Sequence, residues 1–170
     1  MRAAPIVFAV WLAAAPCLAQ GQNQEPVGCD KFKWPLDNER AMLAADAPTV
    51  ASGTNLSHPL PLAVIVSLVS LADAKLPAPP ERAPKSPTSY AGFVQVAAPQ
   101  AAGSYKVTLS SEAWIDVAQN GHFVKSTAFT SVTGCDGVRK SVKFDLAAQP
   151  ITLELSGVPS NTIRMAVTGD

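Results

Sequence analysis

The chain has 170 residues, with 13 basic and 13 acidic side chains, so its formal net charge at pH 7 is zero. This length suits a single domain. A neutral chain without a basic patch or an acidic tail is a poor partner for nucleic acid or for an anionic membrane, so we expect neither.

The first 19 residues have the pattern of a secretory signal peptide. Arg2 supplies an early positive charge, an apolar run extends from Ile6 to Ala15, and a polar stretch begins at Gln20. The apolar run is too short to cross a bilayer. We therefore expect a mature protein that begins near Gln20, is periplasmic or secreted, and has no membrane span.

The cysteines predict one disulfide. Cys17 would leave with the signal peptide, and Cys29 and Cys135 would remain as an even pair in an oxidising compartment. Cys135 belongs to a tight loop, Gly134 to Gly137, whereas Cys29 begins an arm that has to be held to the rest of the chain. We predict that Cys29 and Cys135 are bonded to each other.

Residues 20–59 are predicted to be an N-terminal arm with one short helix. Asp37 is a plausible N-cap, Glu39 would lie in the first turn where an acid is favoured, and the helix should end before Pro48. Two turns of helix are marginal alone. The arm should therefore dock through apolar side chains, among them Leu36, Met42 and Leu43.

Two aromatic residues of the arm, Phe32 and Trp34, are separated by one lysine. Such a pair could form a stacking platform for a sugar or a peptide. The alternative is packing, which is the commoner role of large apolar side chains beside a cysteine tether, and we favour it. Both residues are kept as possible ligand-binding residues.

Residues 60–170 are predicted to form the β-sandwich domain. The run from Leu60 to Leu71 also fits a helical face, but its β-branched composition favours a central strand from about Ala63 to Leu71. Five prolines follow in residues 77–87, which we expect to be an extended connection that wraps the surface or crosses between the sheets. Another strand is expected from Ala91 to Val96.

From Gly103 to Val167 apolar and polar residues alternate with period 2, as in half-buried antiparallel strands. The predicted core positions are Tyr105, Val107, Leu109, Val142, Phe144, Leu146, Ile151, Leu153, Leu155, Ile163, Met165 and Val167. The predicted opposite face carries Lys106, Lys143, Asp145, Glu154 and Arg164. The fold class is therefore mostly β: a single antiparallel β-sandwich, jelly-roll-like, with about seven to nine strands and one short N-terminal helix.

The segments YAGFVQV, AGSYKVTLS, AWIDV and LELSG resemble the strand order of bacterial pre-peptidase C-terminal type β-sandwiches, over roughly residues 90–167. The segments CDKFKWPLDNER and GCDGVRKSVKF are similar to a family of small secreted alphaproteobacterial proteins without an assigned activity. Chains of that kind are sometimes labelled homogentisate 1,2-dioxygenase. The first resemblance implies a sandwich fold, and the second implies secretion.

The residues do not support the dioxygenase label. A non-haem iron oxygenase needs two histidines and a carboxylate on one face, and this chain has only His58 and His122, without a neighbouring His-x-Glu or His-x-Asp spacing. No motif of a nucleophilic, zinc or phosphate-binding site is present either. We predict no catalytic residue, no metal and no cofactor.

Two groups of polar residues are candidate sites. Asp116, Asn120, His122 and Asp136 would make a calcium site only if they met at one loop end, and ordinary turn polarity explains them better. Arg139, Lys140 and Lys143 form a modest cationic cluster, for which a solvated sheet face is the preferred interpretation.

Trp114 is the most informative single residue. Alternation puts Ile115 and Val117 on the core side of its strand, so Trp114 and Asp116 should point outward. An outward tryptophan is either covered or serves as a binding anchor. We favour coverage by the N-terminal arm and keep Trp114 as a possible ligand-binding residue.

The expected function is a non-catalytic periplasmic or secreted β-sandwich module that binds another envelope component, a protein or a glycan. Two alternatives stay open. One is a small enzyme with a loop-built site around His122, together with Asp116 or Asp136. The other is a structural accessory of a secreted assembly.

Overall fold

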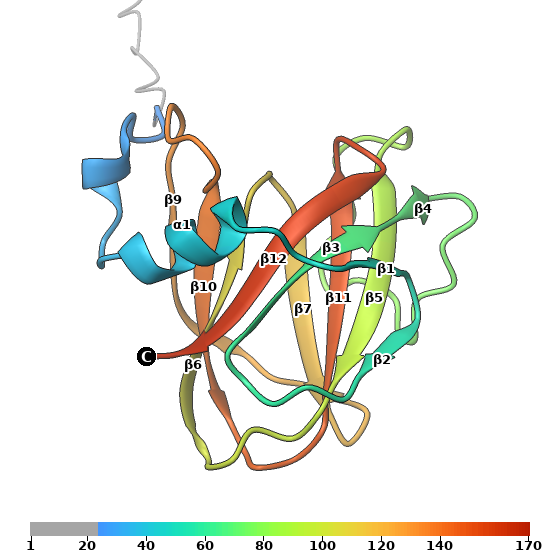
Figure 1. Cartoon of the computed structure of the whole chain (residues 1–170). Helices are drawn as coiled ribbons and strands as arrows, with labels where there is room; N and C mark the ends of the chain where they lie inside the picture. Colours follow the sequence, from blue (N-terminus) through green and yellow to red (C-terminus); the bar gives the residue numbers. More distant parts are fainter. Residues whose placement is uncertain (1–23) are drawn as a thin grey trace, which may run out of the picture.

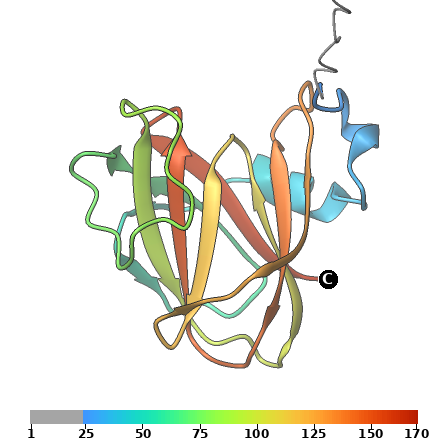
Figure 2. The same cartoon turned by 180° about the vertical axis from the view of Figure 1, so that it is seen from behind.

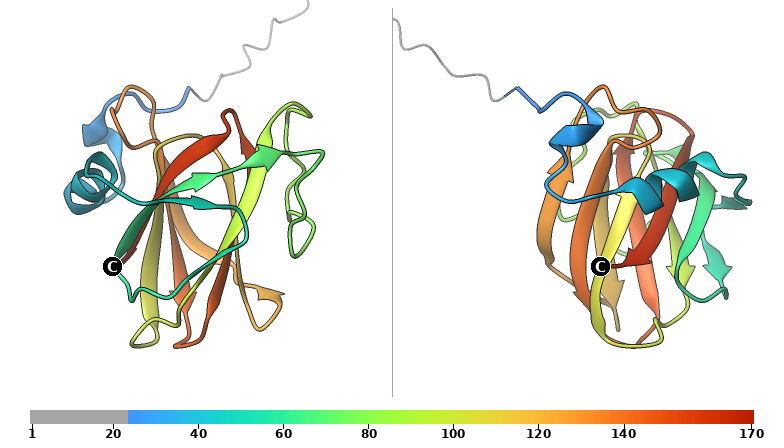
Figure 3. Two further views of the ribbon diagram at one scale, coloured as in Figure 1. Left: turned by 45° about the vertical axis from the view of Figure 1, so that its right-hand side comes forward. Right: turned by 60° about the vertical axis from the view of Figure 1, so that its left-hand side comes forward.

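Two β-sheets packed face to face form the body of the protein, in a computed structural model that describes residues 24–170. The layers are seen in Figure 1 and, from two more sides, in Figure 3. The mostly-β sandwich with one short helix is confirmed. The signal peptide and the expected start near Gln20 lie outside the described residues.

The helical elements are the 3-10 turn η1 (Cys29–Lys31) and the helix α1 (Asp37–Ala44). The strands are β1 (Thr49–Ala51), β2 (Thr54–Leu56), β3 (Leu62–Ser67), β4 (Val69–Ser70), β5 (Tyr90–Val96), β6 (Gly103–Leu109), β7 (Trp114–Gln119), β8 (His122–Phe123), β9 (Ser126–Ser131), β10 (Lys140–Leu146), β11 (Ile151–Val158) and β12 (Thr162–Gly169). The first sheet has the order β1-β3-β12-β6-β10-β9. The second sheet has the order β2-β5-β11-β7-β8, and β4 also pairs with β5.

The core lies between the sheets and uses the positions that alternation predicts. Every predicted core residue is buried except Tyr105, which is half-buried at the edge of the cluster. Val64, Val66 and Val94 complete the core from β3 and β5. Period-2 patterning therefore fixed which face of each long strand turns inward.

The strand inventory differs from the prediction in three ways. Residues 24–170 contain twelve strands instead of seven to nine, partly because residues 49–56 contribute the edge strands β1 and β2. These two pair in parallel with β3 and β5, whereas the other strand pairs are antiparallel. The predicted strand from Ala63 to Leu71 breaks at Leu68, so that β3 belongs to the first sheet and β4 to the second.

The outer face of the first sheet is covered by the N-terminal arm. Helix α1 lies across β12 and β3 (Figure 3, right), and Leu36 and Leu43 pack against Val138 and Ala166. Docking through the arm's apolar residues is thus confirmed. The predicted N-cap is displaced by one position, because Asp37 is already helical and Leu36 precedes it without a side-chain cap.

One buried ion pair joins the arm to this sheet. The side chain of Glu39 is 2% exposed, lies 2.9 Å from the ammonium of Lys106, and accepts a hydrogen bond of 2.5 Å from Thr168. Lys106 therefore does not lie on a solvent face, as alternation alone suggested. Alternation shows which side of a sheet a residue lies on, but it does not show whether another segment of the chain covers the outer side.

The outer face of the second sheet is covered by the proline-rich segment, residues 77–87, which we call the strap. Figure 2 shows this connection passing in front of β5 and β11. The backbone N–H of Ala78 donates to Glu154 at 3.2 Å, and that of Glu81 donates to Asp116 at 3.2 Å. The strap thus wraps the surface as predicted, and it buries Glu154, which was expected to face solvent.

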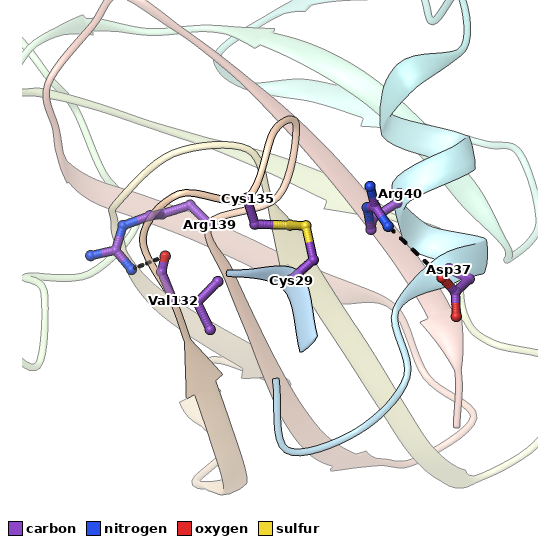
Figure 4. Close-up of a disulfide and its surroundings, with 6 residues drawn as sticks. All are labelled: Cys29, Asp37, Arg40, Val132, Cys135 and Arg139. Carbon is purple, nitrogen blue, oxygen red and sulfur yellow. Dashed lines mark hydrogen bonds and ion pairs between the residues drawn. A yellow bond between two sulfur atoms is a disulfide. The ribbon is translucent and has the colours of Figure 1, made fainter. Parts of the chain in front are cut away.

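The predicted disulfide between Cys29 and Cys135 is confirmed, with an S–S distance of 2.04 Å (Figure 4). Backbone hydrogen bonds flank it, since Thr133 donates to Pro26 at 2.9 Å and accepts from Gly28 at 2.8 Å. The start of the arm is therefore fixed to the loop before β10. Neither helical element within residues 24–170 is long enough to span a membrane.

Candidate functional site

A groove beside Trp114 is the candidate binding site of the described chain. It has a volume of about 340 Å³ and lies where the strap meets the starts of β7 and β10. We call it the Trp114 groove. Its lining includes Arg82, Glu112, Trp114, Arg139, Lys140 and Ser156.

The position of Trp114 follows from the alternation of β7. Ile115 and Val117 are buried in the core, so Trp114 and Asp116 point to the outer side of the second sheet. The indole Nε1 donates to Oδ1 of Asp116 at 2.7 Å, which fixes the ring. Trp114 is half-buried beside the strap residue Arg82, so the expectation that the helical arm covers it was wrong.

Two cations approach the indole ring. The guanidinium of Arg82 and the ammonium of Lys140 each lie 5.4 Å from its centroid. Lys140 also donates to the carbonyl oxygen of Ala113 at 2.8 Å, and burial lowers the pKa of its ammonium. Among residues 24–170, no carboxylate lies within ion-pair distance of Arg82 or Lys140.

The acids of the groove are already paired. Arg139 contacts Glu25 in a short ion pair and lies 3.9 Å from Glu112, which in turn is 4.0 Å from Lys85. Arg139 also donates to the carbonyl of Val132 at 2.8 Å, a contact drawn in Figure 4. The positive charge that remains unpaired in the groove therefore belongs to Arg82 and Lys140.

The cationic cluster predicted from sequence is divided by the fold. Arg139 and Lys140 line the Trp114 groove, whereas Lys143 lies 4.7 Å from the ring of Trp34 under the arm. Residues three apart on a strand project to opposite sides, which separates Lys140 from Lys143. All three side chains are half-buried, so the solvated sheet face was the wrong interpretation.

The lining of the groove also includes one buried polar residue and one exposed aromatic residue. The hydroxyl of Ser156, a residue that is 2% exposed, has no hydrogen-bond partner within the described chain. Phe129 on the edge strand β9 is 58% exposed, and Lys33 lies 5.1 Å from its ring. A bound molecule would therefore meet an aromatic edge and two cations, whereas the hydroxyl of Ser156 is buried.

A pair of buried carboxyl groups lies under the strap, next to the groove. Asp116 and Glu154 face each other directly across β7 and β11 and are 3% and 2% exposed. Burial raises the pKa of Glu154 to about 6, and the neighbouring charge of Asp116 adds to this effect. Burial also raises the pKa of Asp116, against the hydrogen bonds from Trp114 and Glu81.

Phe32 and Trp34 lie at the interface between the arm and the first sheet. Both are half-buried and pack against the cluster of Leu36, Leu43 and Val138. They also line a second, shallow groove of about 440 Å³ around η1 and the start of α1. Their packing role is the one favoured from sequence, and the structure does not bring them near Trp114.

The candidate calcium and iron ligands do not assemble. His122 and Asn120 belong to the hairpin of β7 and β8, which lies at the opposite end of the sandwich from the Asp136 loop (Figures 1 and 2), and Asp116 is under the strap. His58 is exposed in another loop. Within residues 24–170, no three His, Cys, Asp or Glu side chains are grouped as metal ligands.

Sequence reasoning found Trp114 but missed Arg82, Ser156 and Glu154. Arg82 lies within the strap, and the proline-rich sequence does not show which residues of the sheet a strap residue lies against. Glu154 and Ser156 occupy outer positions of β11, which alternation assigns to solvent. The one available signal was the proline-rich stretch itself, because an extended segment expected to wrap a small domain has to cover one of its faces.

Comparisons with known proteins leave the family open. No family model matches the chain, and no curated protein matches it. Among solved structures, a β-glucosidase from Paenibacillus barengoltzii matches 72% of this chain with 12% identity and a TM-score of 0.30. This chain spans only 13% of that enzyme's length, and a likeness at this level carries no argument. The two family resemblances drawn from the sequence stay predictions.

Proposed function

We propose that the protein is a non-catalytic binding module of the periplasm or of the secreted fraction, and that the Trp114 groove binds an envelope glycan that carries carboxylate groups. The disulfide suits an oxidising compartment. The observation that carries the proposal is the pair of cations, Arg82 and Lys140, that approach Trp114 without a carboxylate partner among residues 24–170.

The charge of these two side chains indicates the ligand. A half-buried lysine without a counter-ion is costly to keep charged, as its lowered pKa shows. A carboxylate bound between Arg82 and Lys140 would offset that cost and form charge-assisted hydrogen bonds. Affinity for the ligand should therefore depend on its carboxylate and fall with salt.

The shape and the polar groups of the groove favour a sugar over a peptide. A volume of about 340 Å³ is at the small end of ligand sites, which suits one or two sugar rings. Trp114 offers an aromatic surface on which a sugar ring can pack. The edge strand β9 lines the groove only with Phe129 and Ser131, which is a shorter edge than an added peptide strand requires.

The groove offers little to a hydrolytic reaction. Its own carboxylates, Glu25 and Glu112, are paired with Arg139, and the buried pair Asp116 and Glu154 does not line it. A general acid and base must reach the reacting bond within hydrogen-bond distance. Binding without turnover is therefore the activity that the arrangement supports best.

Calorimetry with tetragalacturonate and its methyl ester tests this proposal. The ester keeps the sugar rings and removes the charge, so we expect binding of the acid and at least a tenfold weaker binding of the ester. Trp114→Ala and Lys140→Gln should each weaken binding of the acid. Lys125→Gln, a change of an exposed lysine after β8 that does not line the groove, is the matched control.

Three results would count against the proposal. Equal affinity for acid and ester would remove the role of the carboxylate. An unchanged affinity in both Trp114→Ala and Lys140→Gln would place binding elsewhere. Binding of hexaglutamate but not of any acidic oligosaccharide would favour a protein partner instead of a glycan.

A further inference from the structure

We propose that the strap is a pH-dependent latch, which docks on Glu154 and Asp116 in mildly acidic solution and is released from the second sheet as the pH rises. The docked strap supplies one wall of the Trp114 groove, so the latch would regulate that site. The connection to ligand binding rests on the proposed function, whereas the latch itself does not.

The number of backbone N–H donors at the start of the strap equals the number of carboxyl groups that lie beneath it. In the run Pro77-Ala78-Pro79-Pro80-Glu81, three residues are prolines and have no backbone N–H. The two N–H groups that remain, those of Ala78 and Glu81, are the ones that donate to Glu154 and Asp116, each at 3.2 Å. Every backbone donor of this run is therefore used to hold the strap to the sheet.

The two carboxyl groups that anchor the strap lie in surroundings that favour protonation of one of them. Glu154 is 2% exposed, its Oε2 has no hydrogen-bond partner within the described chain, and the carboxyl group opposite it is that of Asp116. The charged groups that face Asp116 are Glu81 of the strap and Lys140 of β10, and within residues 24–170 no cation is paired with Glu154. Two ionised carboxylates side by side in this position repel each other and lack water, so one of them favours the protonated form.

The direction of the pH effect follows from linkage. With the strap docked, burial outweighs the hydrogen bond from Ala78, which favours the ionised form, and raises the pKa of Glu154 to about 6. Release that exposes this carboxyl group to water would return its pKa to the ordinary value of 4.5. Docking therefore takes up a proton between these values, and it weakens as the pH rises through them. A difference of 1.5 (6 minus 4.5) corresponds to about a 30-fold change in the docking equilibrium.

Docking also determines the geometry of the groove. Arg82, Pro84 and Lys85 of the strap line it, and Arg82 approaches the ring of Trp114. The same carboxyl group that accepts from Glu81 accepts from the indole of Trp114. Release of the strap thus removes one of the two cations from Trp114 and alters the support of its ring.

Hydrogen exchange of the Ala78 and Glu81 amides, measured without any ligand from pH 4.5 to 7.5, tests the latch. After correction for intrinsic exchange, we expect protection of both amides to fall about 15-fold across this range, with a midpoint between pH 4.5 and 6. Glu154→Gln, which keeps the shape and cannot ionise, should give protection that no longer depends on pH. Asp145→Asn, on an exposed carboxylate of β10, should keep the wild-type profile.

Protection of the two amides that is constant across this range in the wild-type protein would overturn the proposal. So would a pH dependence that persists in Glu154→Gln. If that variant does not fold, the wild-type profile alone decides, together with Asp116→Asn, which should move the midpoint to lower pH by removing the neighbouring charge. Since no glycan is present, a negative result leaves the proposed ligand untouched, and failure of glycan binding leaves the latch untouched.

Discussion

The ammonium of Lys106 lies 2.9 Å from Oε1 of Glu39, so the acid that the arm inserts into the first sheet is paired with a base. The second sheet has no such pair, since Glu154 lies under the strap beside another acid, Asp116. Both outer faces of the sandwich are thus covered by an irregular or helical segment that is held by a buried carboxyl group. The two groups respond to pH in opposite directions.

Removing the charge of Glu39 should destabilise the protein. Glu39→Gln leaves Lys106, whose side chain is 12% exposed, without its main partner, and we expect a loss of about 3 kcal/mol in the free energy of unfolding. Urea denaturation measures it. Asp37→Asn on the exposed side of the same helix is the control and should change little, because its pair with Arg40 at 3.9 Å is solvated. Equal effects of the two changes would contradict the importance of the buried pair.

The free energy of unfolding should depend on pH because Glu154 is buried and its pKa is raised. Its pKa is raised in the folded state, so between pH 4.5 and about 6 the folded protein binds a proton that the unfolded chain has released. The free energy of unfolding should fall by about 2 kcal/mol as pH rises through this window. Glu154→Gln should remove that fall, which denaturation at pH 4.5 and 7 would reveal.

The contribution of Glu39 to stability depends on pH in the opposite direction to that of Glu154. Burial alone would raise its pKa, but hydrogen bonds from Thr168 and Lys106 outweigh this and lower the pKa below its usual value. Its stabilising contribution is present above pH 4.5 and is lost as the pH falls further. A stability profile of Glu39→Gln parallel to that of the wild type below pH 4.5 would contradict this assignment.

Removal of the Cys29–Cys135 disulfide should destabilise the N-terminal arm before it destabilises the sandwich. The two residues are 106 positions apart, and closing a loop of that size stabilises the fold by about 4 to 5 kcal/mol in the chain-entropy model. We expect the double variant Cys29→Ser, Cys135→Ser to keep a folded sandwich with a lower Tm. Hydrogen exchange should rise in α1 before it rises in β10 and β12. Simultaneous loss of all protection would show that the arm and the sandwich unfold as one unit.

Gly92 on β5 should not tolerate a side chain. A Cβ there would lie 2.8 Å from Cδ2 of Leu68 and 2.8 Å from Oγ of Ser52, so we expect Gly92→Ala to lower the free energy of unfolding by about 1 to 3 kcal/mol. Gly169→Ala is the control, because a Cβ at that position meets nothing within 4 Å. Thermal denaturation of both variants measures the difference.

What could be predicted from the sequence is governed by local periodicity. The core sides of β6, β10, β11 and β12 follow from alternation, which depends only on the chain's own pleat. The Cys29–Cys135 pair followed from counting thiols in an oxidising compartment. The docking of α1 followed because a two-turn helix needs support.

What could not be predicted depends on which segment covers which face. Glu154 has the alternation of a solvent-facing residue, and only the path of residues 77–87 buries it. Trp114 was expected under the arm, but the arm covers the other sheet. Arg82 reaches the indole through an extended segment without periodicity, so no pattern in the sequence could give its register.

The central claim, an acidic glycan in the Trp114 groove, is tested most directly by the indole N–H signals of Trp114 and Trp34 in ¹⁵N-labelled protein. Trp114 lines the Trp114 groove and Trp34 lines the shallow groove around η1, so each indole serves as the control for the other. During titration with tetragalacturonate, we predict a saturable shift of the Trp114 signal that is weakened by salt and by Lys140→Gln, while the Trp34 signal stays in place. A shift of Trp34 alone, or of neither signal at saturating glycan, would contradict the account.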